Sequence, residues 1–468
     1  MPRIVKLFVA VTVALSFVTA TCNANLEIQS SGPVFVLEQE KYYPELNLIT
    51  VGDLTGDGKL EVVVATGDGV EVLDDTLQPL ASFTFPSSPT ALATGNIDGY
   101  PALIVGSSAA GAAYYLRLQQ GRLVQVSRTG YLWSSVSFIC VANLTGLYGD
   151  DLLIVTEDAR LLLFTWDGKG FRSVTETSLP FQPEFMAVGD LGHTAQAEVV
   201  LAKGNHLQVL TYDDGSFHGI WDNYTWGNIN HVSILPVEKT PQLVIGTKEK
   251  IIQSYRYKDQ RFQLENHYFG EHLSLTGFSP CNLGLGHFTI VGYSDDRNPV
   301  LMKASGKNLL PLWTNRNTDS TIRNVLVAGT DTLVTSTDNL VQLWKRRPVN
   351  YHTIFLNAEP YTARFPALIA YDTIYISLPD MGDLVGIDYS YIQPGKIAKI
   401  PYWHHFLTLY EGVWQVFLGQ ESIALDGPVI TYNNQTYVPL SCLTKVFGLT
   451  AVWDHSRRIL WIEKATFE

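Results

Sequence analysis

A short acidic turn phrase recurs along the first two thirds of the chain, and it constrains the fold more than any other feature. Its copies begin at Asp53, Asn96, Asn143 and Asp190, at intervals of 43, 47 and 47 residues. Each copy stands between short apolar runs, and the Gly, Asp and Asn of these turns favour tight reversals of the chain. Four short strands in each repeat of about 40–50 residues are typical of a β-propeller blade.

The composition agrees with a folded protein that is mainly β. Hydrophobic residues make up 46% of the 468 residues and charged residues only 16%, which excludes a disordered chain. Aromatic residues reach 12%, and strands favour aromatic side chains. The net charge of −13 argues against nucleic acid or an anionic lipid surface as a partner.

The later units extend the pattern to a predicted ring of seven blades, with six and eight as alternatives. They are less regular and cover residues 230–257, 275–304 and 324–344. The seventh unit has no obvious fourth strand, whereas the strand-like run at 33–38 precedes the first unit. We expect this run to complete the seventh sheet, because closure by the opposite chain end protects the seam of the ring. The predicted propeller spans residues 30–348.

The first copy of the phrase contains a candidate cation site. Side chains that carry oxygen stand at Asp53, Thr55, Asp57 and Glu61, and glycines at 56 and 58 permit a tight turn. Ca²⁺ takes about 6–8 oxygen ligands, and a loop of this kind supplies them. A plain Asp/Gly turn without a cation is the alternative.

The stretch from 51 to 64 also resembles the FG-GAP repeat (integrin-type, VCBS-like), whose phrase is Val-Gly-Asp, a hydrophobic residue, then Gly-Asp-Gly. The resemblance implies that the loop binds Ca²⁺ and stiffens its blade. The implied ligands are the side chains of Asp53, Thr55, Asp57 and Glu61 and the carbonyl of Lys59. The later copies are shortened or differently spaced, which disfavours a cation there.

After residue 348 the pattern of apolar runs and turn residues changes. We predict a second, smaller α+β domain at 349–468. Two segments that begin at Pro366 and Pro428 are alike, and each is predicted to form two strands, a short helix and then a closing strand. The helices are expected at 378–384 and 440–447, the second ending at a glycine that suits a helix carboxyl terminus. The domain is therefore predicted to consist of two similar halves.

The second half resembles the copper amine oxidase N-terminal-like domain, a stalk domain of secreted and cell-wall bacterial proteins. The matching residues are 436–440, 448–449 and 452–454, whereas Ser377 stands where the first half would have Pro. The resemblance implies association with the cell envelope, but the oxidase chemistry belongs to a separate catalytic domain. His352 follows Tyr351 where the quinone motif has an acidic residue, and His404 and His405 would point to opposite faces of a strand. We expect no copper and no amine oxidase activity.

The amino terminus has the order of a secretory signal peptide, predicted at 1–24. A basic start precedes an apolar run at 7–18 and then small residues, and the run is short for a spanning helix. Cleavage after Ala20 or Ala24 is expected, with acylation of Cys22 or a retained anchor as alternatives. No later stretch is long and apolar enough to span a membrane, so we expect an extracellular or cell-envelope protein. Its remaining cysteines are predicted to be buried free thiols.

Two classes of function stay open, and the first is favoured. In one, a non-enzymatic scaffold binds a protein or glycan ligand with its propeller, while the second domain associates with the envelope. In the other, an extracytoplasmic polysaccharide lyase or hydrolase has its site in the propeller channel, although no catalytic residue is predicted and the common catalytic motifs are missing. A purely structural surface protein is a third alternative. Five tryptophans are candidates either for a binding face or for packing between blades: Trp133, Trp221, Trp226, Trp313 and Trp344.

Overall fold

The computed structural model divides into two compact units, which meet in sequence at Arg347 and Pro348. It describes residues 34–108, 111–146, 149–192, 194–235, 241–269, 277–281, 289–293, 299–305, 308–314, 322–347, 353–370, 373–393, 397–402, 404–432, 435–454 and 456–463. The predicted signal peptide at 1–24 lies outside these residues. Among the residues described, there is no helix with the length and apolar character needed to cross a membrane.

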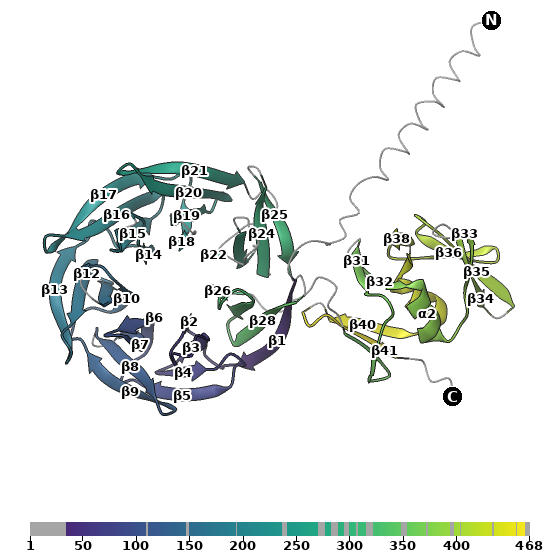
Figure 1. Cartoon of the computed structure of the whole chain (residues 1–468), viewed down its shortest axis with the longest axis horizontal. Helices are drawn as coiled ribbons and strands as arrows, with labels where there is room; N and C mark the ends of the chain where they lie inside the picture. Colours follow the sequence, from purple (N-terminus) through teal and green to yellow (C-terminus); the bar gives the residue numbers. More distant parts are fainter. Residues whose placement is uncertain are drawn as a thin grey trace, which may run out of the picture. The chain divides into compact units, whose positions relative to one another are not determined.

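Antiparallel sheets of four strands form a ring in the first unit (Figure 1). Successive sheets follow the chain, so each sheet is a meander whose first strand is innermost. Their strands are β2 (Leu48–Gly52), β3 (Glu61–Thr66), β4 (Gly69–Leu73) and β5 (Pro79–Thr84); β6 (Pro89–Ile97), β7 (Tyr100–Ser107), β8 (Ala113–Gln119) and β9 (Arg122–Arg128); β10 (Val136–Ala142), β11 (Asp151–Thr156), β12 (Arg160–Trp166) and β13 (Phe171–Ser178); and β14 (Phe185–Gly189), β15 (Glu198–Lys203), β16 (His206–Asp213) and β17 (Ser216–Tyr224).

An eight-stranded sheet comes next, and a single parallel pairing between Phe269 and Asn308 joins its two four-stranded halves. The first half contains β18 (Ile229–Leu235), β19 (Gln242–Thr247), β20 (Ile251–Lys258) and β21 (Arg261–Phe269). The second contains β22 (Gly277–Cys281), β23 (Thr289–Tyr293), β24 (Pro299–Ser305) and β25 (Asn308–Thr314). Apart from this one pairing, each half repeats the meander of the other sheets.

The two ends of the first unit close the ring within one sheet. β26 (Asn324–Val327), β27 (Thr332–Ser336) and β28 (Leu340–Arg347) are joined by β1 (Val34–Tyr42), which pairs antiparallel with β28. The prediction that the run at 33–38 supplies the missing fourth strand is confirmed. The indole of Trp344 is fully buried here, donates to Thr335 Oγ1 at 2.9 Å and packs edge-on against Trp313.

Glycines allow the innermost strands of neighbouring sheets to approach closely. A Cβ atom added to Gly52 in β2 would lie 2.4 Å from the side chain of Thr94 in β6, and one added to Gly95 would lie 2.7 Å from Cβ of Val141 in β10. The threonine hydroxyl also donates to the carbonyl of Val51 at 2.8 Å. These glycines precede Asp53 and Asn96, so the repeated Gly-Asp or Gly-Asn pair serves packing between sheets.

The described residues of the second unit form three sheets and two short helices. Its strands are β29 (Thr353–Leu356), β30 (Glu359–Tyr361), β31 (Leu368–Ala370), β32 (Thr373–Ser377), β33 (Ser390–Gln393), β34 (Ile397–Tyr402), β35 (His405–Tyr410), β36 (Gln415–Leu418), β37 (Glu421–Ala424), β38 (Ile430–Tyr432), β39 (Gln435–Pro439), β40 (Thr450–Asp454) and β41 (Ile459–Glu463). The helices are α2 (Leu378–Val385) and α3 (Ser441–Phe447), which lie where the sequence predicts them.

The two halves of this unit share a central sheet of order β31-β32-β39-β38. Each half contributes one hairpin followed by one helix, as predicted, and both helices end at a left-handed glycine, Gly386 and Gly448. The expected closing strand of the first half is replaced by a five-stranded sheet, β33 to β37. Ser377, which stands in place of Pro, caps α2 by accepting a hydrogen bond from the amide of Asp380 at 3.1 Å.

Candidate binding surface and predicted cation loop

The predicted cation loop joins β2 to β3, and its carboxylates accept hydrogen bonds from the loop's own amides. Asp53 accepts from the amides of Gly56 at 2.6 Å and Gly58 at 2.9 Å, and Asp57 accepts from that of Lys59 at 2.9 Å. Glu61 is buried and accepts from the amide of Leu54 at 2.6 Å. The Lys59 side chain points elsewhere and pairs with Asp75 at 3.1 Å.

The third and fourth copies of the phrase repeat the role of Glu61. Asp151 accepts hydrogen bonds from the amides of Leu144 and Thr145, and Glu198 accepts from that of Leu191 at 2.7 Å. All three carboxylates are buried at the start of the second strand of their sheet. Burial raises the pKa of Glu61 and of Glu198, while the amide donors act in the opposite direction. The acidic residue that ends the phrase is thus an anchor for the loop.

Asn143 shows what an amide in place of a carboxylate contributes in the third copy of the phrase. Its Nδ2 donates to the carbonyl of Ala195 at 2.9 Å, which lies in the equivalent loop of the next sheet. Its carbonyl oxygen Oδ1 accepts from the amide of Gly146 at 3.0 Å, as Asp53 does from Gly56. A carboxylate has no hydrogen to donate, so the asparagine gains a bond between neighbouring sheets.

The residues of the first loop have the oxygen chemistry that suits Ca²⁺. In the described part of the chain, however, no three His, Cys, Asp or Glu side chains gather into a group that could hold a metal ion. The amide of Lys59 lowers the pKa of Asp57, so this carboxyl is ionised at neutral pH and available to a cation. Calcium binding by Asp53, Thr55, Asp57, Lys59 and Glu61 stays a prediction.

Exposed aromatic side chains gather at the opposite edge of the ring, where the fourth strand of one sheet leads to the first strand of the next. Among the described residues of the first unit, seven large aromatic side chains are exposed, and six lie at this edge. We name these six the aromatic rim: Tyr42, Tyr131, Trp133, Tyr224, Trp226 and Phe269. The seventh, Tyr100, lies in the β6–β7 hairpin on the edge that carries the cation loop. Exposed aromatic rings are the usual anchors of a binding surface.

Trp133 is the most exposed aromatic residue of the rim, at 88%, and its loop is held from both sides. Leu132, its neighbour, is buried in the core, and its amide donates to the carbonyl of Gly111 at 2.6 Å. The backbone of Trp133 has a φ of 61°, in the left-handed region that bulky residues rarely adopt. Strain of this kind persists where the surroundings enforce it, and it is concentrated at functional sites.

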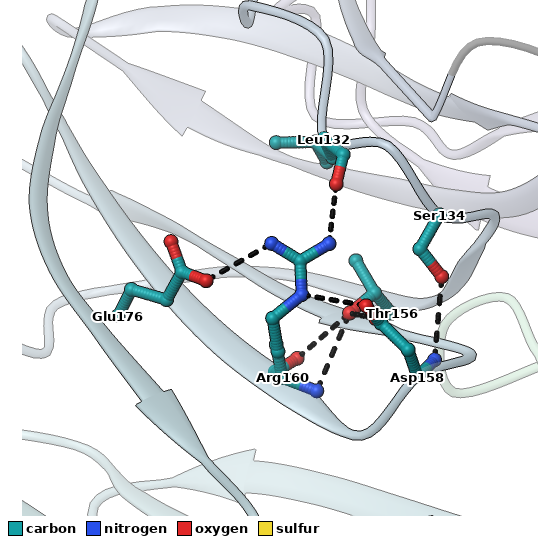
Figure 2. Close-up of polar contacts among 6 residues, drawn as sticks. All are labelled: Leu132, Ser134, Thr156, Asp158, Arg160 and Glu176. Carbon is teal, nitrogen blue, oxygen red and sulfur yellow. Dashed lines mark hydrogen bonds and ion pairs between the residues drawn. The ribbon is translucent and has the colours of Figure 1, made fainter.

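Arg160, at the start of β12, fixes this loop from the neighbouring sheet (Figure 2). Its guanidinium donates to the carbonyl of Leu132, to Asp158 at 2.8 Å and to Glu176 at 2.9 Å. The amide of Asp158 in turn donates to the hydroxyl of Ser134 at 3.2 Å. The planar guanidinium can satisfy three acceptors in fixed directions, so Trp133 stands on a braced backbone.

The next two junctions between sheets also carry aromatic groups. Between β13 and β14, Phe181 contacts His206, whose ring stacks on that of Tyr224 with centroids 4.8 Å apart. His206 Nε2 also lies 3.0 Å from each carboxylate oxygen of Asp222. At the following junction, Trp226 packs edge-on against His267, at 5.4 Å. Aromatic rings therefore occur at three successive junctions.

The five tryptophans considered from the sequence separate into two roles. Trp133 and Trp226 are exposed on the rim, as a binding face requires. Trp313 and Trp344 are buried at the closure of the ring, and Trp221 stacks on Phe262 of the next sheet at 4.6 Å. Sequence position relative to the strand ends could have separated them, because the two exposed residues stand in connections between strands.

The burial and bonding of the cysteines, and the exposure of His404 and His405, can be compared with the sequence predictions. Cys442 is buried, as predicted, whereas Cys140 is half-buried; both are free, and burial raises the pKa of each thiol to about 12. Cys22 and the side chain of Cys281 lie outside the described residues. His405, like His404, is exposed on the second unit.

Comparison with known proteins identifies the second unit. Residues 355–462 match the family model of the copper amine oxidase N-terminal domain. The second unit is a copper amine oxidase N-terminal-like domain. The prediction of this domain is confirmed, and the match leaves the first unit uncovered. No curated protein matches the chain.

Solved structures match the fold of 68% of the chain. A crystal structure of BBS1N in complex with ARL6DN, soaked with lead, has a TM-score of 0.50 and 12% identity, covering 68% of this chain and 98% of that one. The mercury-soaked form has a TM-score of 0.49 and 15% identity, with the same coverage. At such identities the likeness concerns the fold alone. It agrees with the ring of four-stranded sheets, so the first unit has a β-propeller-like fold, as predicted.

Proposed function

We propose that this chain is an extracytoplasmic binding and scaffold protein of the bacterial cell envelope. Its propeller binds a protein or glycan ligand through the aromatic rim, and the copper amine oxidase N-terminal-like domain associates it with the envelope. The observation that carries the proposal is the placement of six of seven exposed aromatic side chains of the described propeller on one edge. The similar BBS1N structure is a complex with another protein, which supports a binding role.

In this proposal the propeller has seven blades and is an inert support for the rim. The eight-stranded sheet counts as two blades, since only the pairing of Phe269 with Asn308 joins its halves. The FG-GAP-like loop at Asp53 stiffens its blade with Ca²⁺ on the edge opposite the ligand. The signal-like amino terminus directs the chain out of the cytoplasm.

Co-sedimentation with purified bacterial cell walls tests the proposal. The secreted full chain should pellet with the walls, and the double variant Trp133→Ala/Trp226→Ala should pellet less. Tyr100→Ala is the matched control, because this exposed aromatic residue lies on the other edge. Retention of the wild-type chain in the supernatant with every wall preparation would contradict envelope association, and a double variant that binds the walls with wild-type affinity would contradict a wall ligand of the rim. Release of new sugar ends from the walls would instead favour the lyase or hydrolase.

A further inference from the structure

We propose that the ligand of the aromatic rim is a neutral polysaccharide with equatorial linkages, stacked on Trp133 and Trp226. This inference rests on the proposed function and gives it a ligand class. A pyranose ring linked in this way has flat faces of C–H groups and an edge of hydroxyl groups. Such a ligand needs exposed aromatic planes with hydrogen-bonding side chains beside them, and the rim offers both.

The kind of apolar residue on the rim favours a sugar over a protein surface. The exposed large aliphatic residues described in the propeller are Val124, Val174, Ile220 and Leu264. All four lie within the outermost strands, away from the rim, which carries aromatic rings instead. Protein interfaces usually have a contiguous apolar core. Small groups of aromatic rings at successive junctions match a chain of sugar rings better.

The polar groups beside the rings supply partners for hydroxyl groups. Asp222, held by His206, has a side chain that is 57% exposed, and His206 stacks on Tyr224. The guanidinium of Arg128 lies 5.3 Å from the ring of Tyr131. A carboxylate accepts and a guanidinium donates, so both types of hydrogen bond to hydroxyls are available.

The charges below Trp133 and the net charge of the chain favour a neutral polymer over an acidic one. Arg160 is paired with Asp158 and Glu176, so the brace below Trp133 presents no free cation for a polyanion. The whole chain carries a net charge of −13, which repels acidic polysaccharides at long range. A neutral sugar needs no cationic partner and is not repelled by the negative charge of the chain.

The fixed geometry of the loop reduces the cost of binding. Leu132 is buried, and its amide and carbonyl are both bonded, so the loop's own contacts hold the left-handed backbone of Trp133. Binding therefore orders few additional groups, and more of the stacking energy contributes to affinity.

Calorimetric titration of the full chain with hexasaccharides tests the inference. The probes are cellohexaose and chitohexaose, which are neutral and β-1,4-linked, together with α-linked maltohexaose and the acidic hexamer of galacturonic acid. We expect binding of a β-1,4-linked probe, and affinity for it reduced by about tenfold or more in Trp133→Ala and in Trp226→Ala. Tyr100→Ala should bind as the wild type does, and circular dichroism of each variant checks its fold.

The outcomes separate this inference from the proposed function. If no neutral probe binds, while wall pelleting still depends on Trp133 and disappears after protease treatment of the walls, the ligand is a protein and the glycan inference is wrong. Preference for maltohexaose or for the acidic probe also overturns it. If neither probes nor walls respond to the rim variants, both the inference and the proposed function fail.

Discussion

The guanidinium of Arg160 donates a hydrogen bond to the main-chain carbonyl of Leu132, the buried residue between the exposed rings of Tyr131 and Trp133. Arg160 belongs to β12 of one sheet, whereas the connection that contains Leu132 arrives from β9 of the sheet before it. A side chain of one sheet thus holds the backbone next to an exposed aromatic residue in the connection from the preceding sheet. Arg160 is a positioning residue for the rim.

Replacing Arg160 with Lys should loosen this connection although the charge is kept. A single ammonium group cannot reproduce the planar fork that reaches Leu132, Asp158 and Glu176 together. We expect faster hydrogen exchange in the peptide that covers 129–135 and a stability loss of about 1 kcal/mol. Arg122→Lys, at the exposed start of β9, is the control. Unchanged exchange in Arg160→Lys would show that the other bonds hold the loop alone.

Two tryptophan substitutions should affect different properties: one should reduce stability and the other should reduce ligand binding. Trp344→Ala removes a fully buried indole that bonds to Thr335 at the closing sheet, so we expect a stability loss of about 3–5 kcal/mol. Trp133→Ala removes an exposed ring and should change stability by no more than about 0.5 kcal/mol while reducing ligand binding. Urea denaturation measures both. Equal losses in the two variants would contradict the division of the tryptophans into closure and rim.

The sequence predicts the ring, its closure and the second domain because each has a local signature. Turn residues recur at a fixed period, the run at 33–38 is strand-like, and the segments around Val438 and Val452 match a known phrase. These features depend on neighbouring residues, so they can be recognised without the fold.

The rim and the roles of the acidic residues depend on contacts that the sequence does not reveal. Glu61 reads as a calcium ligand, but only the fold brings its carboxylate to the amide of Leu54. From the sequence alone, Asn143 is only a departure from the Asp of other copies. Its role becomes clear from its hydrogen bond to Ala195, 52 residues away. The bracing of Leu132 by Arg160 likewise joins separate sheets. Side-chain exposure at a junction follows from such long-range contacts.

Calcium should raise the melting temperature of the wild-type protein, because a ligand that binds only the native state stabilises it by mass action. Asp57→Asn should remove this effect, since it replaces an ionised ligand of the predicted site. Asp190→Asn in the fourth copy is the matched control and should keep the response. Differential scanning calorimetry with added CaCl₂ and then excess chelator measures the shift. A melting temperature that calcium leaves unchanged would refute the predicted site.

Gly95→Ala should destabilise the propeller by about 1–3 kcal/mol, the usual cost of overpacking. The new Cβ atom would lie 2.7 Å from Cβ of Val141, and neither innermost strand can move without disturbing its sheet. Gly130→Ala is the control, because a Cβ atom there meets nothing within 4 Å. Urea midpoints compare the two variants. If Gly95→Ala costs as much stability in a Val141→Gly background as in the wild type, the close contact is not the cause.

Acidification should destabilise the protein through His231 of β18. Burial lowers the pKa of this histidine to about 4, whereas an unfolded histidine has a pKa of about 6.5. Between these values the unfolded chain binds a proton that the folded chain does not, so stability is complete above about pH 6.5 and falls as the pH decreases. The slope from this one group is at most about 1.4 kcal/mol per pH unit. Melting temperatures at pH 7 and pH 5 should therefore differ less in His231→Gln than in the wild type, while the exposed His218→Gln should keep the full difference. An identical difference in all three proteins would show that His231 is protonated in the folded state.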